Sequence, residues 1–253
     1  MKSVAIIQGR MSSRRLPGKI LMDIEGKPLL AHVVQRAKAS GVFDFVVFAT
    51  TTDPTDDPVV EYCAREAIEC FRGDLNDVLE RYYQAARTYG AEMVTRLTAD
   101  CPLLDPAVIK KVVQAFDPDR YDYVSNAIRR TYPDGLDTEV FSIAALTRAR
   151  NEAKLPSERE HVTPYIHKHP DLFRIGHVTQ EHDLSMLRWT VDEPQDLAFV
   201  RAVFAELGGD IFGQEEILAL LARKPELQTI NEGIICNEGY KKSLNDDPHL
   251  PSS

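Results

Sequence analysis

Short apolar runs alternate with helical patterns through the first half of the chain, and this alternation restricts the fold more than any other feature. The apolar runs are typical of buried strands; they cover residues 4–7, 45–49, 93–97 and 121–124. Between and after them, apolar residues recur with helical spacing over 29–39, 59–67, 78–89 and 108–116. Strands that alternate with helices of this length predict an α/β fold with a mainly parallel sheet covered on both faces.

The second half of the chain departs from this alternation. Residues 127–190 lack it, and we expect them to form an inserted arm or lobe, with a helix from Ala144. An apolar run over 187–192 predicts a further sheet strand. Helical spacing returns over 195–206 and 214–222. The segment 231–253 is polar and contains prolines, so we expect a frayed tail there and a single domain over 1–230.

Composition limits the function classes. Thirty Lys and Arg residues stand against 39 Asp and Glu residues, a net charge of -9, whereas a general nucleic-acid binder needs a broad basic face. No apolar run approaches the roughly 20 residues of a membrane-spanning helix, and the N-terminus lacks a signal-peptide core. Four scattered cysteines without a CxxC pair are typical of reduced thiols. We therefore expect a cytoplasmic protein that binds neither nucleic acid nor membranes.

A basic loop stands out against this acidic background. Residues 8–19 read QGRMSSRRLPGK and follow the first predicted strand. The loop carries four cations, which are Arg10, Arg14, Arg15 and Lys19. Guanidinium groups and backbone N–H groups in a glycine-containing loop suit a polyphosphate. The loop matches neither the P-loop spacing nor GxGxxG, and taken alone it is equally compatible with a solvated basic turn.

Two aspartates follow or end predicted strands. Asp100 lies in RLTADCPLLD and Asp192 in WTVDEPQDL. Ligands of open α/β sheets gather beyond the carboxyl ends of strands, where carboxylates can hold Mg²⁺ beside phosphates. In isolation a turn before proline explains Asp100 at least as well, and Glu193 and Asp196 suit a helix N-terminus. Combined with the basic loop, however, the two aspartates predict metal-assisted attack on a nucleotide phosphate.

Other polar motifs carry less specific signals. Arg72 precedes a predicted helix and is placed to meet a nucleotide or to lie on the surface. YPDGLDTEVF carries three carboxylates around a glycine, and a β-turn explains its Asp-Gly pair without a ligand. EREHVTPYIHKH offers several polar residues, but the spacing of its histidines is no zinc pattern, so we interpret them as polar contacts or surface residues.

At this point the order of the motifs resembles a known family. QGRMSSRRLPGKIL and IEGKPLLAHVVQRA closely resemble the opening of sugar-acid cytidylyltransferases, the group of the CMP-Kdo and CMP-acylneuraminate synthetases. FRGDLNDVLERYYQAA, RLTADCPLLDP, YPDGLDTEVFS, EREHVTPYI and WTVDEPQDL are similar to the spore-coat polysaccharide (SpsF-type) branch. The resemblance covers roughly residues 1–222. It implies a three-layer nucleotide-diphospho-sugar transferase fold, CTP as the nucleotide, Mg²⁺, and a homodimer joined through the inserted arm.

The motifs also imply roles for individual residues. The expected catalytic residues are Arg10, Lys19, Asp100 and Asp192, and the two aspartates are the expected metal ligands. The expected nucleotide-binding residues are Gln8, Gly9, Arg10, Ser12, Ser13, Arg15, Lys19, Arg72, Thr98 and Asp100. The expected acceptor-binding residues are Asn126, Asp134, Asp137, Glu139, Arg159 and His161. In the CMP-Kdo enzymes the metal aspartate lies in QGDEP rather than TADCP, and their sugar-binding residues do not map cleanly here, which leaves the acceptor open.

The expected reaction is therefore transfer of CMP from CTP to a sugar acid or related acceptor. An acceptor oxygen attacks the α-phosphorus in line and pyrophosphate leaves, as a step in surface polysaccharide or glycan biosynthesis. No residue stands out as the general base. Two alternatives remain at this stage: a glycosyltransferase that uses a nucleotide sugar, although TADCP is not the usual DxD motif, and a nucleotide-binding protein without turnover.

Overall fold

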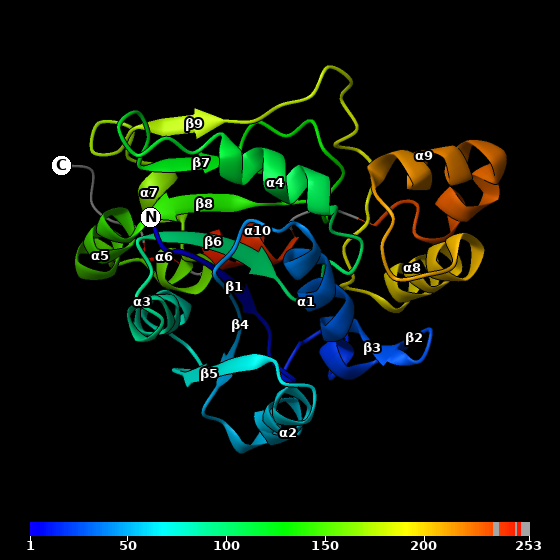
Figure 1. The fold of residues 1–253 in the computed structure, drawn as a ribbon, viewed down its shortest axis with the longest axis horizontal. Coiled ribbons are helices and arrows are strands. Elements are labelled where there is room, and N and C mark those ends of the chain that lie inside the picture. Colours follow the sequence, from blue (N-terminus) through cyan, green and yellow to red (C-terminus); the bar gives the residue numbers. More distant parts are fainter. Residues whose placement is uncertain (235–237, 246, 249–253) are drawn as a thin grey trace.

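A seven-stranded sheet forms the centre of the molecule (Figure 1). The computed structural model describes residues 1–234, 238–245 and 247–248. The strand order in the sheet is β5-β4-β1-β6-β8-β7-β9. These strands are β1 (Ser3–Gln8), β4 (Phe45–Thr51), β5 (Glu69–Gly73), β6 (Met93–Thr98), β7 (Tyr123–Ser125), β8 (Glu139–Ser142) and β9 (Ile175–His177). A two-stranded ribbon lies apart from them and consists of β2 (Asp23–Ile24) and β3 (Lys27–Pro28).

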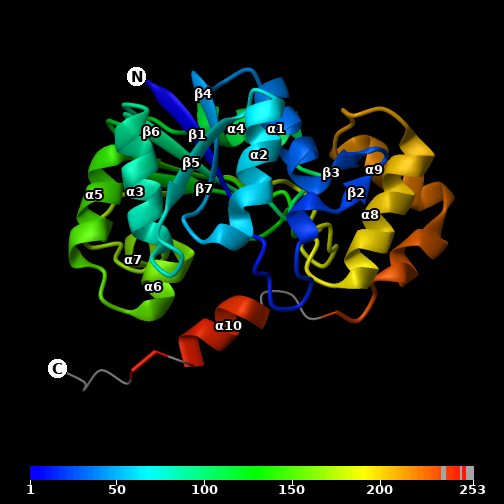
Figure 2. The same cartoon turned by 90° about the horizontal axis from the view of Figure 1, so that it is seen from below.

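Helices cover both faces of the sheet and make the fold a three-layer α/β structure, which confirms the predicted class. One face packs against α1 (Leu29–Ala39), α2 (Asp57–Arg65) and α4 (Pro106–Gln114), and the other against α3 (Val78–Thr88), α5 (Ile143–Glu152), α6 (Pro156–His161) and α7 (Pro164–His167). Helices α8 (Pro194–Leu207) and α9 (Gln214–Arg223) lie side by side at one end (Figure 2). Three 3₁₀ turns are η1 (Lys19–Leu21), η2 (Pro54–Asp56) and η3 (Pro225–Ile230). The last described helix is α10 (Glu238–Asn245).

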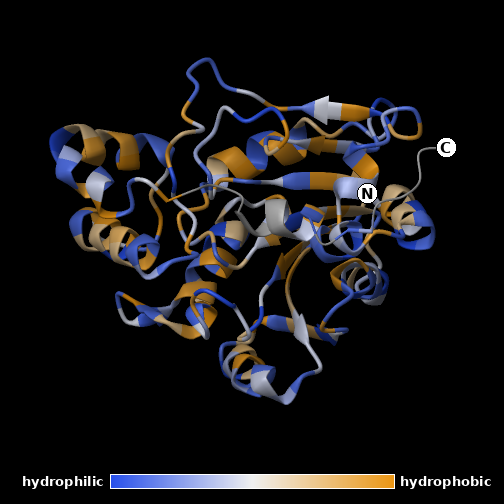
Figure 3. Ribbon diagram, turned by 180° about the vertical axis from the view of Figure 1, so that it is seen from behind, coloured by the Kyte–Doolittle hydropathy of each residue, from blue (hydrophilic) through white to orange (hydrophobic). Residues whose placement is uncertain are grey.

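The central strands are apolar on both sides because both faces are covered. In β1, Val4 and Ile6 pack into the cluster beneath α3, whereas Ala5 and Ile7 pack into the cluster beneath α1. Strand β1 pairs in parallel with β4 and β6, as the sequence predicted, and β8 runs antiparallel to β6 and β7. Coloured by hydropathy, the strands and the helices that cover them carry hydrophobic stretches alongside hydrophilic ones (Figure 3). The sheet is therefore fixed by burial from both sides.

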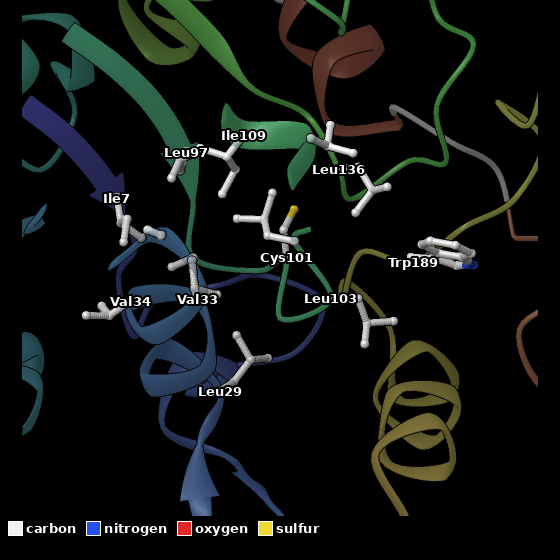
Figure 4. Packing of buried hydrophobic residues seen from close by; sticks show 14 of the residues in the cluster. Ile7, Leu29, Val33, Val34, Leu97, Cys101, Leu103, Ile109, Leu136 and Trp189 are labelled. Atoms are coloured by element: carbon white, nitrogen blue, oxygen red, sulfur yellow. The ribbon is translucent and has the colours of Figure 1, made fainter. Parts of the chain in front are cut away.

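The larger core cluster runs up to the carboxyl ends of the strands. Figure 4 shows Ile7 and Leu97 from neighbouring strands near Val33 of α1, with Leu103 and Cys101 from the loop after β6. Leu97 is fully buried, and shortening such a leucine to alanine costs about 2–5 kcal/mol. This packing anchors the loop after β6, which carries one of the predicted site residues. No helix in the described part of the chain has the length and apolar character to cross a membrane.

Three expectations about the second half need correction. The segment 127–190 is not wholly an inserted arm, because β8 and β9 within it are strands of the main sheet. The run 187–192 forms no strand: a single bridge links Asp134 with Arg188, and the backbone then turns to bond Val191 N to Asp100 O at 2.8 Å. The extended segment thus holds two different loops together, which its apolar pattern could not show.

The C-terminal tail is the third correction. We expected 231–253 to be frayed, but within it Glu238–Asn245 form α10, a helix that packs against α6 (Figure 2); 235–237, 246 and 249–253 lie outside the described residues. Ser243 on α10 shares its hydroxyl with Glu160 and His161, at 2.8 and 2.9 Å. Asp247 accepts hydrogen bonds from the backbone N and the hydroxyl of Ser157 at 2.9 and 2.6 Å. Polar contacts of this kind are invisible to a search for apolar periodicity.

Candidate active site

Two neighbouring strand ends bring the basic loop and the first aspartate together. Strands β1 and β6 pair in parallel with Gln8 opposite Thr98, so the chain leaves both strands at the same edge of the sheet. The basic loop follows β1, and Asp100 follows β6 two residues later. This is the edge at which open α/β sheets collect their ligands. The topology therefore confirms that these two predicted site segments are neighbours.

Glycine is needed where the loop leaves the sheet. A Cβ on Gly9 would lie 2.6 Å from Cβ of Ala99 and 2.8 Å from the Phe48 ring. Gly18 adopts φ +73°, a left-handed conformation that favours glycine, and it directly precedes η1. The first glycine lets the chain pass between its neighbours, and the second turns it so that Lys19 points back toward the strand ends.

Lys19 lies at the centre of the site. Its Nζ is 3.0 Å from Asp100 Oδ2, 2.8 Å from Asp192 Oδ1 and 2.7 Å from the carbonyl oxygen of Val191. An ammonium group has three donors, and these three acceptors use all of them. The structure thus brings together three of the predicted catalytic residues around one buried cation.

Burial and charge work against each other in this cluster. Burial by itself disfavours the charge on Lys19, but the carboxylates of Asp100 and Asp192 raise its pKa above the ordinary value. Burial likewise acts to raise the pKa of Asp100, yet the ammonium of Lys19 and a hydrogen bond from Thr98 lower it to about 2. Both groups are therefore charged at neutral pH, and each depends on the other for its charge.

A second layer of charges fixes Asp192. Its Oδ2 lies 2.9 Å from Arg15 NH2 and 3.3 Å from Arg188 NH2. Arg188 is 5% exposed at its side chain and forms two hydrogen bonds of 2.8 Å with the fully buried carboxylate of Asp196. Asp196 also accepts the backbone N–H groups of Asp192 and Glu193 at 2.9 Å. This network sets the position of the loop that carries Asp192.

Sequence reasoning missed Arg188 and undervalued Asp196. We had explained Asp196 by its place at the start of a helix, and α8 does begin there with this side chain accepting from the backbone. The signal for a larger role was the spacing in LRWTVDEPQD, which puts an arginine four residues before one aspartate and eight before another.

The two aspartates meet the requirements of a divalent cation. Both point at the same ammonium, and both side chains are partly exposed, at 28% and 22%. No group of three or more His, Cys, Asp or Glu side chains within the described ranges is arranged to hold a metal ion. Mg²⁺ typically uses only one or two carboxylates and completes its shell with water and substrate phosphates. The residues therefore fit an ion that arrives with a triphosphate.

The remaining residues of the basic loop have distinct positions. Arg10 donates to the carbonyl oxygen of Leu75 at 3.1 Å, while Ser12 and Arg14 are exposed and Ser13 is half-buried. The backbone N of Met11 donates to Asp56 at 2.7 Å, which ties the loop to η2. Arg10 and Arg15 thus face other parts of the site, whereas Arg14 faces solvent.

A small cavity opens beside this loop. It has a volume of about 130 Å³ and is lined by Gln8, Gly9, Arg10, Val78, Arg81, Glu160 and His161. The side-chain oxygen of Gln8 is buried there and has no hydrogen-bond partner in the described structure. An unpaired buried acceptor costs about 1–3 kcal/mol, which favours a ligand that donates to it. The cavity joins predicted nucleotide-binding residues to one predicted acceptor-binding residue, His161.

The guanidinium groups of Arg72 and Arg159 form hydrogen bonds and ion pairs with neighbouring residues. Arg72 donates to the carbonyl oxygens of Thr51 and Asp53 at 2.7 and 2.9 Å and pairs with Asp57. Arg159 pairs with Asp77, the residue that caps the N-terminus of α3. In the described part of the chain both arginines hold loops in place; their binding roles stay predictions.

The predicted acceptor-binding residues fall into two groups. The side-chain amide of Asn126 is hydrogen-bonded to the backbone: it donates to Leu136 O at 2.9 Å and accepts from Thr138 N at 2.8 Å. Glu139 is buried and pairs with Arg96, with further hydrogen bonds from Tyr123 and Thr163 at 2.6 Å. These two residues support the site rather than offer free atoms to a ligand.

Asp134 and Asp137 share one cation at the edge of the site. Arg130 lies 3.3 Å from Asp134 Oδ1 and 2.8 Å from Asp137 Oδ2. Asp134 also lies 3.8 Å from Arg188, which connects it to the network around Asp192. His161 donates or accepts at Ser243, and burial lowers its pKa to about 4. Of these three residues, His161 lines the cavity beside the basic loop.

Comparison with known proteins agrees with this geometry. A family model described as cytidylyltransferase matches residues 4–219. The spore coat polysaccharide biosynthesis protein SpsF of Bacillus subtilis is 32% identical over 238 residues, which are 90% of this chain and 97% of that protein. The 3-deoxy-manno-octulosonate cytidylyltransferase of Serratia proteamaculans is 35% identical over 120 residues, 45% of this chain and 46% of that one.

A solved structure extends the likeness to the whole fold. The cytidylyltransferase of Leptospira borgpetersenii superposes with a TM-score of 0.88 at 31% identity, covering 93% of this chain and 99% of that one. The region matched by the family model contains the basic loop and both aspartates. This chain belongs to the cytidylyltransferase family and is a nucleotidyltransferase of the α/β fold.

Proposed function

We propose that the protein transfers CMP from CTP to a hydroxyl group of a sugar acid or related acceptor and releases pyrophosphate. The observation that carries this proposal is the position of Lys19 between Asp100 and Asp192, at 3.0 and 2.8 Å. A cation and two carboxylates at one point are the parts needed to bind a triphosphate together with a divalent ion.

The residues of the site divide the work. Arg10, Arg15 and Lys19 bind the phosphates, since all three extend from the loop after β1 toward the strand ends. Lys19 already uses its three donors, so it must release a carboxylate before it can contact a phosphate. Asp100 and Asp192 hold Mg²⁺, which when bound neutralises charge on the phosphates. Arg188 and Asp196 hold the loop that carries Asp192 in place during the reaction.

The acceptor class is proposed from the family. The Serratia relative is a 3-deoxy-manno-octulosonate cytidylyltransferase, and the Bacillus relative is a spore coat polysaccharide biosynthesis protein. We therefore propose a role in surface polysaccharide synthesis in the cytoplasm, as a homodimer with the remaining loops of 127–190 at the contact. A glycosyltransferase would need to hold only a diphosphate donor, which leaves the extent of the cationic loop unexplained.

Pyrophosphate release tests the proposal. The purified protein is incubated with Mg²⁺, each of the four nucleoside triphosphates and a panel of keto-sugar acids. We expect release with CTP and one acceptor class, lost in Asp100→Asn and Asp192→Asn but retained in Asp210→Asn, a surface carboxylate paired with Lys27 at 2.6 Å. Transfer of a sugar from a nucleotide sugar without pyrophosphate release contradicts the proposal, as does full activity of Asp100→Asn.

A further inference from the structure

The proposed reaction requires a group that takes the proton from the acceptor hydroxyl, and the cluster around Lys19 does not supply one. Lys19 is a cation, and Asp100 has Oδ2 on that ammonium at 3.0 Å and is the proposed ligand of the metal ion. Both oxygens of Asp192 face cations, namely Lys19, Arg15 and Arg188. The proton acceptor must therefore lie elsewhere in the site.

The register of the sheet brings Asp137 near the end of β6, the strand that precedes Asp100. Strand β8 runs antiparallel to β6 with Glu139 opposite Arg96, and continuing this register two residues places Asp137 opposite Thr98, the last residue of β6. The thiol of Cys101 gives an independent marker. Its Sγ is 3.2 Å from Thr98 Oγ1 and 3.6 Å from Asp100 Oδ1, and after burial the charges of Asp100 and Asp137 both raise its pKa. The charge of Asp137 thus acts on the same thiol that contacts Asp100.

One oxygen of Asp137 is unused. Its Oδ2 accepts from Arg130 NH2 at 2.8 Å, whereas its Oδ1 is buried and has no hydrogen-bond partner among the described residues. The side chain as a whole is 23% exposed at its other atoms, so Asp137 borders the surface while Oδ1 itself is covered. Leaving a buried carboxylate oxygen unpaired is unfavourable, and a hydroxyl group of a bound acceptor would satisfy it.

The surroundings of Asp137 also suit proton transfer. Four charged or titratable groups face it: Arg130, Asp134 and Glu139 from its own loop and strand, and Cys101 from the loop after β6. Burial raises its pKa, Arg130 opposes this, and the charges of Asp134 and Glu139 raise it further, to about 6. A general base works best when its pKa lies near the operating pH, because it is then ionised and still basic.

We propose that Asp137 is the general base of the transfer reaction and that its Oδ1 accepts the proton of the acceptor hydroxyl. As the acceptor oxygen forms its bond to the α-phosphorus of CTP, the bond from that phosphorus to the leaving pyrophosphate breaks, and the hydroxyl proton passes to the carboxylate. The resulting carboxylic acid returns its proton to solvent after the products leave. Arg130 is the positioning residue that holds the other oxygen. The inference rests on the proposed function.

The test compares pH profiles of pyrophosphate release in the wild type, Asp137→Asn and a matched control. In the wild type, kcat/KM for the acceptor rises as the pH passes about 6 from below, because only the carboxylate accepts a proton. In Asp137→Asn we expect kcat to fall by about 10²–10⁴-fold and this limb to disappear, while stabilisation by Mg²⁺ and CTP in a thermal melt is unchanged. Asp122→Asn removes an arginine-paired aspartate outside the site and keeps the rate and the limb.

Asp137→Ala covers the case in which the asparagine variant folds poorly. It removes the buried charge and leaves space for a small carboxylate, so added formate is expected to restore part of its rate but none of the rate of Asp100→Ala. A limb that persists in Asp137→Asn, or a wild-type kcat in either variant, overturns the inference and leaves the proposed function intact. Absence of pyrophosphate release from the wild type with every acceptor overturns the proposed function instead.

Discussion

Replacing Lys19 with methionine tests the central cluster most directly. The substitution keeps most of the buried chain length but removes the ammonium between Asp100 and Asp192. In the native protein the pKa of Asp100 is about 2 against an ordinary 3.8. A carboxylate with a lowered pKa stabilises the fold at pH values above its unfolded pKa, and that contribution disappears as the pH falls through the folded pKa. About two pKa units correspond to roughly 2.5 kcal/mol at neutral pH.

Lys19→Met should therefore lose at least this amount at pH 7, and about 3–5 kcal/mol if Asp100 stays charged without the ammonium. For a chain of this size, about 2.5 kcal/mol lowers Tm by roughly 5–10 °C. Without the ammonium, burial and the facing carboxylate raise the pKa of Asp100, so the deficit should shrink between pH 7 and pH 4 as one carboxyl group takes up a proton. Millimolar Mg²⁺ or Mn²⁺ should stabilise the variant more than the wild type, because the ion replaces the missing charge.

Urea unfolding followed by circular dichroism at several pH values, with and without the divalent ion, measures all three effects. Lys27→Met is the matched control. Its ammonium lies 2.6 Å from Asp210, but both side chains are more than one-third exposed, so the cost should not exceed about 1 kcal/mol. Equal stability of Lys19→Met and the wild type at pH 7 would refute the electrostatic reasoning. So would a deficit that is the same at pH 4 and pH 7.

Three further predictions concern the surroundings of the site. Gly135→Ala places a Cβ 2.7 Å from backbone atoms of the adjoining loop at φ +116° and should cost about 2–5 kcal/mol in urea unfolding, against about 1 kcal/mol for Gly26→Ala, which has open space at φ +81°. Asp196→Asn leaves Arg188 buried without its carboxylate and should cost about 3–5 kcal/mol, whereas the double change Asp196→Leu with Arg188→Met should recover most of it. Deleting α10 exposes His161, so its pKa, lowered to about 4 by burial, should rise toward 6.5 in an NMR titration; an unchanged value contradicts the described packing.

The sequence predicted the sheet best where burial is two-sided. The run Phe45–Ala49 and the helix Leu29–Ala39 are apolar in patterns that a covered parallel sheet requires, and both are confirmed. Strand β8 was missed because its first residue, Glu139, is a buried charge neutralised by Arg96 from the next strand. Strand β9 has only three residues and depends on its pairing with β7. Long-range partners of this kind leave no local periodicity.

The site divides in the same way. Motifs singled out Lys19, Asp100 and Asp192, and the structure places these three residues in contact. Nothing in the sequence indicated that Lys19 contacts both aspartates at once. Asp100 lies 81 residues and Asp192 lies 173 residues after Lys19 in the chain. The role of Asp137 depends on one unpaired oxygen, which only the folded arrangement reveals.

The docking of α10 on α6 has a practical consequence for experiments on this protein. Met1 is exposed and precedes β1, so the N-terminus lies at the opposite end of that strand from Gly9 (Figure 2). Helix α10, by contrast, contacts Glu160 and His161, which line the cavity beside the basic loop. An affinity tag or surface linkage placed after α10 would follow directly on the helix that contacts two residues of this cavity's lining. Purification and immobilisation are therefore best designed from the N-terminal end.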